Sequence, residues 1–357
     1  MKKIIGFITF ITLSMNVAAQ SIVDIFGTND KTAQKILKKY GKEVGQLEET
    51  LNKEALGSNA SDETEKRIKD LFLKRMDLLE RIRKENAFLD VDFQTIHYPG
   101  KKNLYTTIEV IERDAPERLK FLTLKSHQAP AKPRKDVIGK MQEYVNTSFS
   151  LIINNKMEKG LVNCPVYHCF LGFENPELKP FLSVFNTAAK NQKKLIIDTL
   201  NKDRSPQRRA AAVLLMGHFS DPKEIISLLL PHVNDKNDEV RNNVSRVIGA
   251  TMEKANIHDI DVKPFLAFLN SPYTTDRNKA LYVLSAATSP ASKQQIIEHS
   301  NNQLIALLKL KQPNNHDIAY RTLKEISGKD FGEHNVTAWQ QWLTSAQKMK
   351  AGKAHTA

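Results

Sequence analysis

The sequence lacks an apolar run long enough to span a membrane. The longest one, at residues 4–15, has about a dozen residues, whereas a transmembrane helix needs about twenty. Lys2 and Lys3 precede this run and small residues at 17–19 follow it, which is the pattern of a secretory signal peptide. We therefore expect a signal peptide over 1–19, no transmembrane anchor, and a periplasmic or secreted location. No cysteine follows the expected cleavage site, so a lipoprotein is not expected.

Cysteine is also scarce, because the 357 residues contain only Cys164 and Cys169. Disulfides form and persist in oxidising compartments, so an exported chain with two nearby cysteines is expected to bond them to each other. Zinc bound by both thiolates and His168 is an alternative, but no fourth ligand is evident nearby. The spacing also differs from the Cys-x-x-Cys of redox-active pairs.

Enzyme motifs are missing as well. The sequence contains no phosphate-binding Gly-Lys-Ser/Thr loop, no His-Glu-x-x-His and no Gly-x-Ser-x-Gly elbow. Asp330-Phe331-Gly332 resembles the magnesium-binding triplet of kinases, but none of the other kinase motifs accompanies it, so we interpret it as a turn. We expect no catalytic residues, no metal and no cofactor.

Acidic residues are outnumbered, with 40 Asp and Glu against 53 Lys and Arg and a net charge of +13. Such a surplus favours an anionic polymer or lipid as a partner, although a basic surface can also serve solubility alone. Positive residues concentrate near Lys190, Lys193 and Lys194, which would share one face of a single helix. These three lysines are a candidate binding surface, with a plain solvated face as the alternative.

After the expected signal peptide, the sequence predicts a small α+β domain over 20–125. Apolar residues recur at helical spacing over 31–56 and 68–82, separated by a polar segment that contains Gly57, which predicts a helical hairpin. Residues 91–98 and 104–112 are rich in β-branched and aromatic residues around a Pro-Gly turn, which predicts a β-hairpin. Prolines among small and charged residues indicate a linker over 126–136.

The remaining chain is predicted to be helical over 137–343, followed by a disordered basic tail over 344–357. Four prolines follow a residue that can cap a helix, a pairing typical of helix starts. These pairs are Asn175-Pro176, Ser205-Pro206, Asp221-Pro222 and Ser271-Pro272.

The helical half contains an internal repeat. Segments beginning at Arg209, Arg241 and Arg277 align with one another at offsets of 32 and 36 residues, a period that indicates stacked helical pairs. The stretch from Asp238 to Gly249 resembles the signature of HEAT-like repeats, a turn acid followed by Val-Arg, small residues and a Gly. The segment at 323–342 resembles the terminal segment of exported bacterial HEAT-like repeat proteins. This resemblance implies a C-terminal α-solenoid of HEAT-like hairpins and implies no settled activity.

Two groups of residues follow from this interpretation. Trp339 and Trp342, on one helical face, would cap the last hairpin by covering its apolar side. The concave side of the solenoid would present a candidate binding surface to a protein or an acidic polymer, made of Arg241, Asn242, Asn243, Arg277 and Asn278.

The leading functional hypothesis is therefore a non-enzymatic exported interaction scaffold with a protein partner. One alternative is a nucleic-acid enzyme built on HEAT-like repeats, such as an alkylpurine DNA glycosylase. The basic charge favours this alternative and the expected export disfavours it, so nucleic acid is not the expected partner. A host-directed secreted factor is the other alternative.

Overall fold

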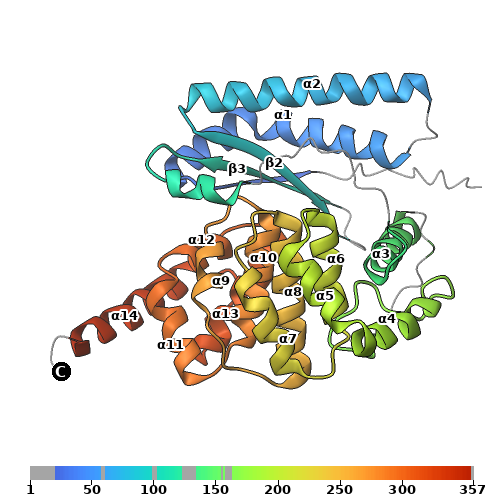
Figure 1. Ribbon diagram of the computed structural model, residues 1–357. Helices are drawn as coiled ribbons and strands as arrows, with labels where there is room; N and C mark the ends of the chain where they lie inside the picture. Colours follow the sequence, from blue (N-terminus) through green and yellow to red (C-terminus); the bar gives the residue numbers. More distant parts are fainter. Residues whose placement is uncertain are drawn as a thin grey trace, which may run out of the picture.

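Helices dominate the structure. The computed structural model describes residues 21–57, 61–98, 103–122, 134–153, 156 and 163–354, and over these residues it contains many helices and one small sheet (Figure 1). The mainly helical fold class is thus confirmed. The expected signal peptide and most of the expected linker lie outside the described residues. None of the described helices has the length and apolar character needed to cross a bilayer.

The N-terminal part is a three-stranded sheet covered by two long helices. The order of its strands is β1-β3-β2, with β2 antiparallel and β1 parallel to the central β3. The predicted helical hairpin and β-hairpin are present, but β1 was missed, so the hairpin is part of a larger sheet. The elements are β1 Ile22–Phe26, α1 Asp30–Gly57, α2 Asp62–Glu85, β2 Asp90–His97, β3 Leu104–Ile111 and the 3-10 helix η1 Pro116–Phe121.

The central strand β3 is buried on both faces, because successive side chains of a strand point to opposite sides. Ile108 and Val110 join the apolar core formed with α1 and α2. Glu109, between them in sequence, points the other way, toward the helical half. The sheet is therefore a layer between the α1–α2 hairpin and the remaining helices, as Figure 1 shows.

The helical half is built from two rows of helices. In one row α6, α8, α10 and α13 each pack against the next, and in the other α5, α7, α9 and α12 each pack against a member of the first. Of the other helices, α3 and α4 precede these rows, α14 follows them, and α11 lies between α10 and α12 in the chain and packs against α9, α13 and α14. The elements are α3 Val137–Ile153, α4 Lys179–Asn191, α5 Lys193–Lys202, α6 Pro206–Met216, α7 Pro222–Leu229, the 3-10 helix η2 Leu230–His232, α8 Asp238–Ala255, α9 Lys263–Phe268, α10 Thr274–Ala286, α11 Pro290–His299, α12 Gln303–Leu308, α13 Pro313–Ser327 and α14 Val336–Ala354.

Capping explains two of the four predicted helix starts. Ser205 and Asp221 accept hydrogen bonds from the first-turn amides of α6 and α7, directly before a proline. The other two predictions were wrong: α4 begins after Leu178, and α10 begins after Tyr273. Near α10, the hydroxyl of Ser271 accepts from the amide of Tyr273, before the helix begins, and donates to the buried Asp276 carboxylate, which needs a donor.

The apolar core of the helical half extends to the sheet. Phe26 of β1 and Phe121 of η1 belong to the same cluster of buried side chains as the helices of the second half. Gln94 of β2 also binds the backbone on both sides of the turn before α10, through the carbonyl of Pro272 and the amide of Thr274. The sheet therefore rests directly on the turns between the helices.

The C-terminal segment also differs from the prediction. The tail expected to be disordered over 344–357 continues α14 as far as Ala354. The side chain of Gln347 donates to the carbonyl of Ile297 in α11, which ties this part of the helix to the rest of the fold. Residues 355–357 lie outside the described part.

Candidate binding groove

The repeated arginines hold the inter-helix turns together. Each of Arg209, Arg241 and Arg277 donates from Nη1 to the carbonyl of the residue six positions earlier, at 3.1, 3.0 and 2.6 Å. Each also binds a carboxylate or amide on a neighbouring segment. The partners are Asp235 for Arg209, Asp276 for Arg241, and Glu109 and Asn315 for Arg277.

Four of the five residues expected on a concave binding surface are therefore buried, and that prediction was wrong. Arg241 and Arg277 are enclosed because their guanidinium groups satisfy turn carbonyls and acids inside the fold. The side chains of Asn243 and Asn278 donate to backbone carbonyls of the neighbouring inner helices α6 and α13. Only Asn242 of this set is partly exposed.

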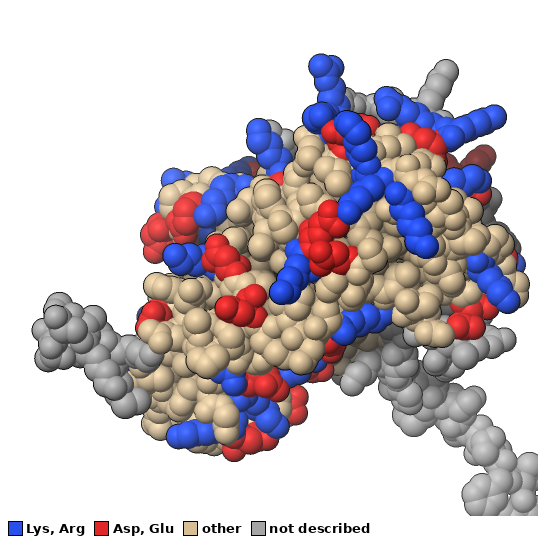
Figure 2. All heavy atoms as spheres, turned by 60° about the horizontal axis from the view of Figure 1, so that its bottom comes forward, with Lys and Arg blue, Asp and Glu red and all other residues tan. Residues whose placement is uncertain are grey.

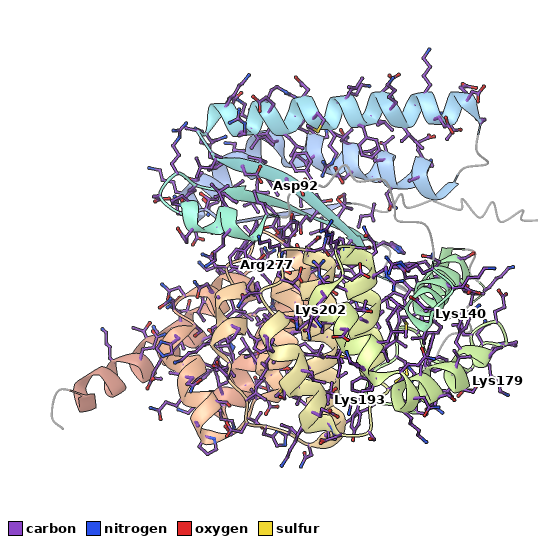
Figure 3. All side chains as sticks on the ribbon, viewed as in Figure 1. Asp92, Lys140, Lys179, Lys193, Lys202 and Arg277 are labelled. Atoms are coloured by element: carbon purple, nitrogen blue, oxygen red, sulfur yellow. A yellow bond between two sulfur atoms is a disulfide. The ribbon has the colours of Figure 1, made fainter. Side chains whose placement is uncertain are left out.

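Arg277 instead joins the sheet to the helices. Its side chain is 0% exposed and that of Glu109 is 1% exposed, and two of its nitrogens lie 2.5 and 2.9 Å from the Glu109 oxygens. Its guanidinium also stacks on the ring of Phe26, with a separation of 4.0 Å. Figure 3 shows Arg277 at the boundary between the sheet and the helices.

The lysines expected to form a basic face are separated and partly neutralised. Lys190 lies in the last turn of α4 and Lys193 begins α5, so the expectation of one shared helix face was wrong. Lys193 lies 2.5 Å from Glu224, and Lys194 pairs with Asp198. Figure 2 shows a face of the molecule on which Lys and Arg are interspersed with Asp and Glu. These lysines therefore do not form a concentrated basic surface that could bind a polyanion.

The two cysteines form a disulfide, as predicted, with a Cα separation of 5.6 Å. Zinc binding by these thiolates is thereby excluded, because both sulfurs are bonded to each other. The amide of Tyr167 donates to the carbonyl of Gly217 at the end of α6, and Lys254 of α8 donates to the carbonyl of Cys164. We call residues 163–173 the disulfide loop, and its contacts place it across the ends of α6 and α8.

Gly217 allows this close approach. A side-chain carbon at Gly217 would lie 2.9 Å from the carbonyl oxygen of His168, so a larger residue would push the loop away. His168 itself is buried, and burial together with the charges of Arg246 and Lys279 lowers its pKa to about 3. The imidazole is therefore neutral at physiological pH.

A groove lies between α3, the disulfide loop and the inner helices α6 and α8. Its volume is about 520 Å³, which falls within the usual range for ligand sites. Phe149 of α3, half exposed, and Phe170 of the disulfide loop pack edge to face and form an aromatic wall. Amide side chains supply donors and acceptors along the rest of the groove, and these belong to Gln142, Asn146, Gln207 and Asn242.

One of the residues that line this groove is a cation, and a second cation lies beside it. The guanidinium of Arg246 lies over the ring of Phe170 at 5.5 Å and donates to Asn242, while its Nε is buried with no hydrogen-bond partner among the described residues. Lys279 of α10 is partly buried beside it. Burial and, to a lesser extent, the charge of Arg246 lower the pKa of Lys279 to about 7. Neither cation has an acidic partner within the part of the chain that the structure describes.

The opposite end of the groove is acidic. Asp238 and Glu239 begin α8, where negative charge is favoured by the helix dipole. Burial and the neighbouring Asp238 both raise the pKa of Glu239. The groove therefore offers a cationic end and an acidic end separated by amides and aromatic rings.

Sequence reasoning placed Asn242 in this region but missed Arg246 and Lys279. The signal was present, because Arg246 lies four residues after Asn242 and must share its helix face.

The two tryptophans at the C-terminal end both pack against the apolar core of the helical half. Trp339 is fully buried, donates from Nε1 to the carbonyl of Gly332, and packs against Phe331 and Trp342. Trp342 is partly buried against the same core. Their assignment as a cap stays a prediction.

Compared with known proteins, the chain matches no family model, no curated protein and no solved structure.

Proposed function

We propose that this chain is an exported, non-enzymatic binding protein whose helical half is a HEAT-like solenoid, and that its groove takes an extended peptide segment carrying a carboxylate. The observation that carries this proposal is the pair formed by Arg246 and Lys279, two enclosed cations without an acidic partner among the described residues. Removing cations from water costs free energy, and a bound carboxylate would offset that cost.

The repeat assignment is supported by the three arginines that bind carbonyls six residues earlier, one at each successive turn. Regular units that contact only their neighbours are typical of solenoids. The disulfide between Cys164 and Cys169 is compatible with export, because such bonds persist in oxidising compartments.

The chemistry of the groove favours a peptide over other anionic ligands. Arg246 can bind a carboxylate through two parallel hydrogen bonds, and the amide side chains can bind a peptide backbone. The aromatic wall suits an apolar side chain of the same segment. Asp238 and Glu239 would repel the successive phosphates of a nucleic acid, so the glycosylase alternative gains no support here.

Selection from a phage-displayed library of random peptides on the immobilised protein tests the proposal. We expect the selected peptides to be enriched in Asp, Glu or a free C-terminal carboxylate. Each of Arg246→Met and Lys279→Met should then weaken a selected peptide about tenfold or more, since a hydrogen bond to a charged group contributes about 1.5–3 kcal/mol.

The matched control is Lys194→Met, which also removes one positive charge but lies outside the groove and is paired with Asp198. This control should leave the peptide affinity unchanged. The proposed function would be refuted if the selected peptides lacked acidic groups and bound the Arg246→Met/Lys279→Met protein as tightly as they bind the wild-type protein.

A further inference from the structure

A second site lies at the other end of the helical half, away from the groove. His316 near the start of α13 meets Glu333 and His334 from the connection between α13 and α14. One ligand atom from each residue lies within 4.8 Å of the others. His316 is buried, whereas Glu333 and His334 are exposed, so the cluster opens to solvent on one side.

The backbone determines which nitrogen of His316 can bind a ligand. Nδ1 lies 2.6 Å from the carbonyl oxygen of Leu308, which can only accept a hydrogen bond, so Nδ1 carries the proton. Nε2 of the same ring faces the Glu333 carboxylate, with 3.1 Å between the nitrogen and Oε1. A histidine that donates from one nitrogen to a carbonyl and leaves the other free is the usual arrangement at metal sites.

The separation of the two acceptors fits a shared cation. Two ligands of a tetrahedral ion with bonds of about 2.0–2.1 Å lie about 3.3 Å apart. Nε2 of His316 and Oε1 of Glu333 lie 3.1 Å apart, close to this value. The His334 ring is stacked against the His316 ring with a centroid separation of 5.5 Å, and being exposed it can rotate toward the same point.

The connecting turn holds the two exposed ligands in place. Gly332, at a φ of 88°, adopts a left-handed conformation and precedes Glu333 directly. Its amide donates to Asp330, and its carbonyl accepts from the buried indole of Trp339. Asp330 is itself bound by Tyr320 and Lys324, so it is engaged in the turn and is not counted as a ligand.

We propose that His316, Glu333 and His334 bind Zn²⁺. Two imidazole nitrogens and one carboxylate oxygen suit this ion, whereas Mg²⁺ and Ca²⁺ prefer oxygen ligands throughout. Three protein ligands leave a fourth position for water or for a side chain of a partner. The ion would also join α13 to the turn before α14. The proposal does not depend on the function assigned to the groove.

Zinc titration of the full exported chain tests the site by isothermal calorimetry, after removal of any affinity tag and treatment with a chelator. We expect saturable binding of one Zn²⁺ per chain and a rise in the melting temperature on addition of the ion. Co²⁺ in place of Zn²⁺ should give the visible absorption of a tetrahedral complex. Each of His334→Ala and Glu333→Gln should weaken Zn²⁺ binding about tenfold or more.

Both substituted residues are exposed, so circular dichroism of the ion-free variants should match the wild type. The matched control is His299→Ala, which removes an exposed histidine elsewhere and should leave binding unchanged. Absence of saturable binding by the wild type would overturn the proposal. Equal Zn²⁺ affinity in the wild type and in the Glu333→Gln/His334→Ala protein would do so as well, because the ion would then lie elsewhere.

Discussion

At the scale of single residues, the arginines of the helical half divide into two kinds. Arg241 and Arg277 serve the interior, where each satisfies a turn carbonyl and a buried acid. Arg246 is only five residues after Arg241, yet it faces the groove and binds no acid in the described part of the chain. The difference follows from helix geometry. Five residues turn a helix by about 500°, which places the Arg246 side chain about 140° around the helix from that of Arg241.

Arg277 provides the first prediction at this scale. Replacing Arg277 by Met should lower the free energy of unfolding by about 3–5 kcal/mol, because Glu109 would remain buried without its counter-charge. Replacing both residues, as in Glu109→Leu/Arg277→Met, should recover much of that loss, since an apolar pair removes the uncompensated charge. Urea denaturation measures both values. Equal stability of the single variant and the wild type would contradict the assigned role.

The same residues mark the limit of what the sequence predicts. The repeat alignment identified Arg209, Arg241 and Arg277 as equivalent, and the structure agrees that they are. Periodicity does not reveal which face a repeated residue occupies, because an arginine in a turn motif and one on a binding face have the same spacing. Burial of Arg277 depends on Glu109, which lies 168 residues away in sequence.

At the scale of elements, local patterns were informative and long-range pairing was not. The hairpin strands were predicted over 91–98 and 104–112, within one residue of β2 and β3 at each end. β1 was missed because its five residues stand next to the expected cleavage site, and its parallel partner is about eighty residues further on. A short apolar run forms a strand only when a neighbouring strand supplies the backbone hydrogen-bond partners.

The disulfide loop carries a prediction at this scale. Changing Cys164 and Cys169 to Ser should lower the free energy of unfolding by about 2 kcal/mol, because the closed loop is small. Binding of a selected peptide should weaken too, since Phe170 in this loop stacks on Arg246. Denaturation with and without a reducing agent is the measurement. A wild-type protein equally stable in both conditions would show that the bond contributes nothing.

At the scale of the whole molecule, the two predicted domains behave as layers of one fold. The sheet lies on the inter-helix turns through Glu109, Gln94 and the buried Arg118, whose Nε donates to the carbonyl of Asn270. Both tryptophans of the chain, Trp339 and Trp342, lie in α14 at the far end of the helices. Tryptophan fluorescence therefore reports on a region remote from the sheet.

This arrangement makes cooperativity testable. Ile108→Ala, in the fully buried centre of β3, should destabilise the protein by about 2–5 kcal/mol. If the layers unfold together, tryptophan fluorescence and circular dichroism should shift to the same lower denaturant midpoint. A fluorescence midpoint that stays at its wild-type value would mean that the helical half unfolds independently of the sheet.

The distance in sequence between Glu109 and Arg277 also affects the nascent chain. Synthesis proceeds from the N-terminus, so β3 leaves the ribosome 168 residues before the arginine that neutralises its buried carboxylate. Until α10 has been made, the face of the sheet that carries Glu109 and Phe26 has no cover from the helices. Contacts between segments so far apart form slowly, and exposed apolar surface promotes aggregation meanwhile. The incomplete chain is thus the form of this protein most in need of a chaperone.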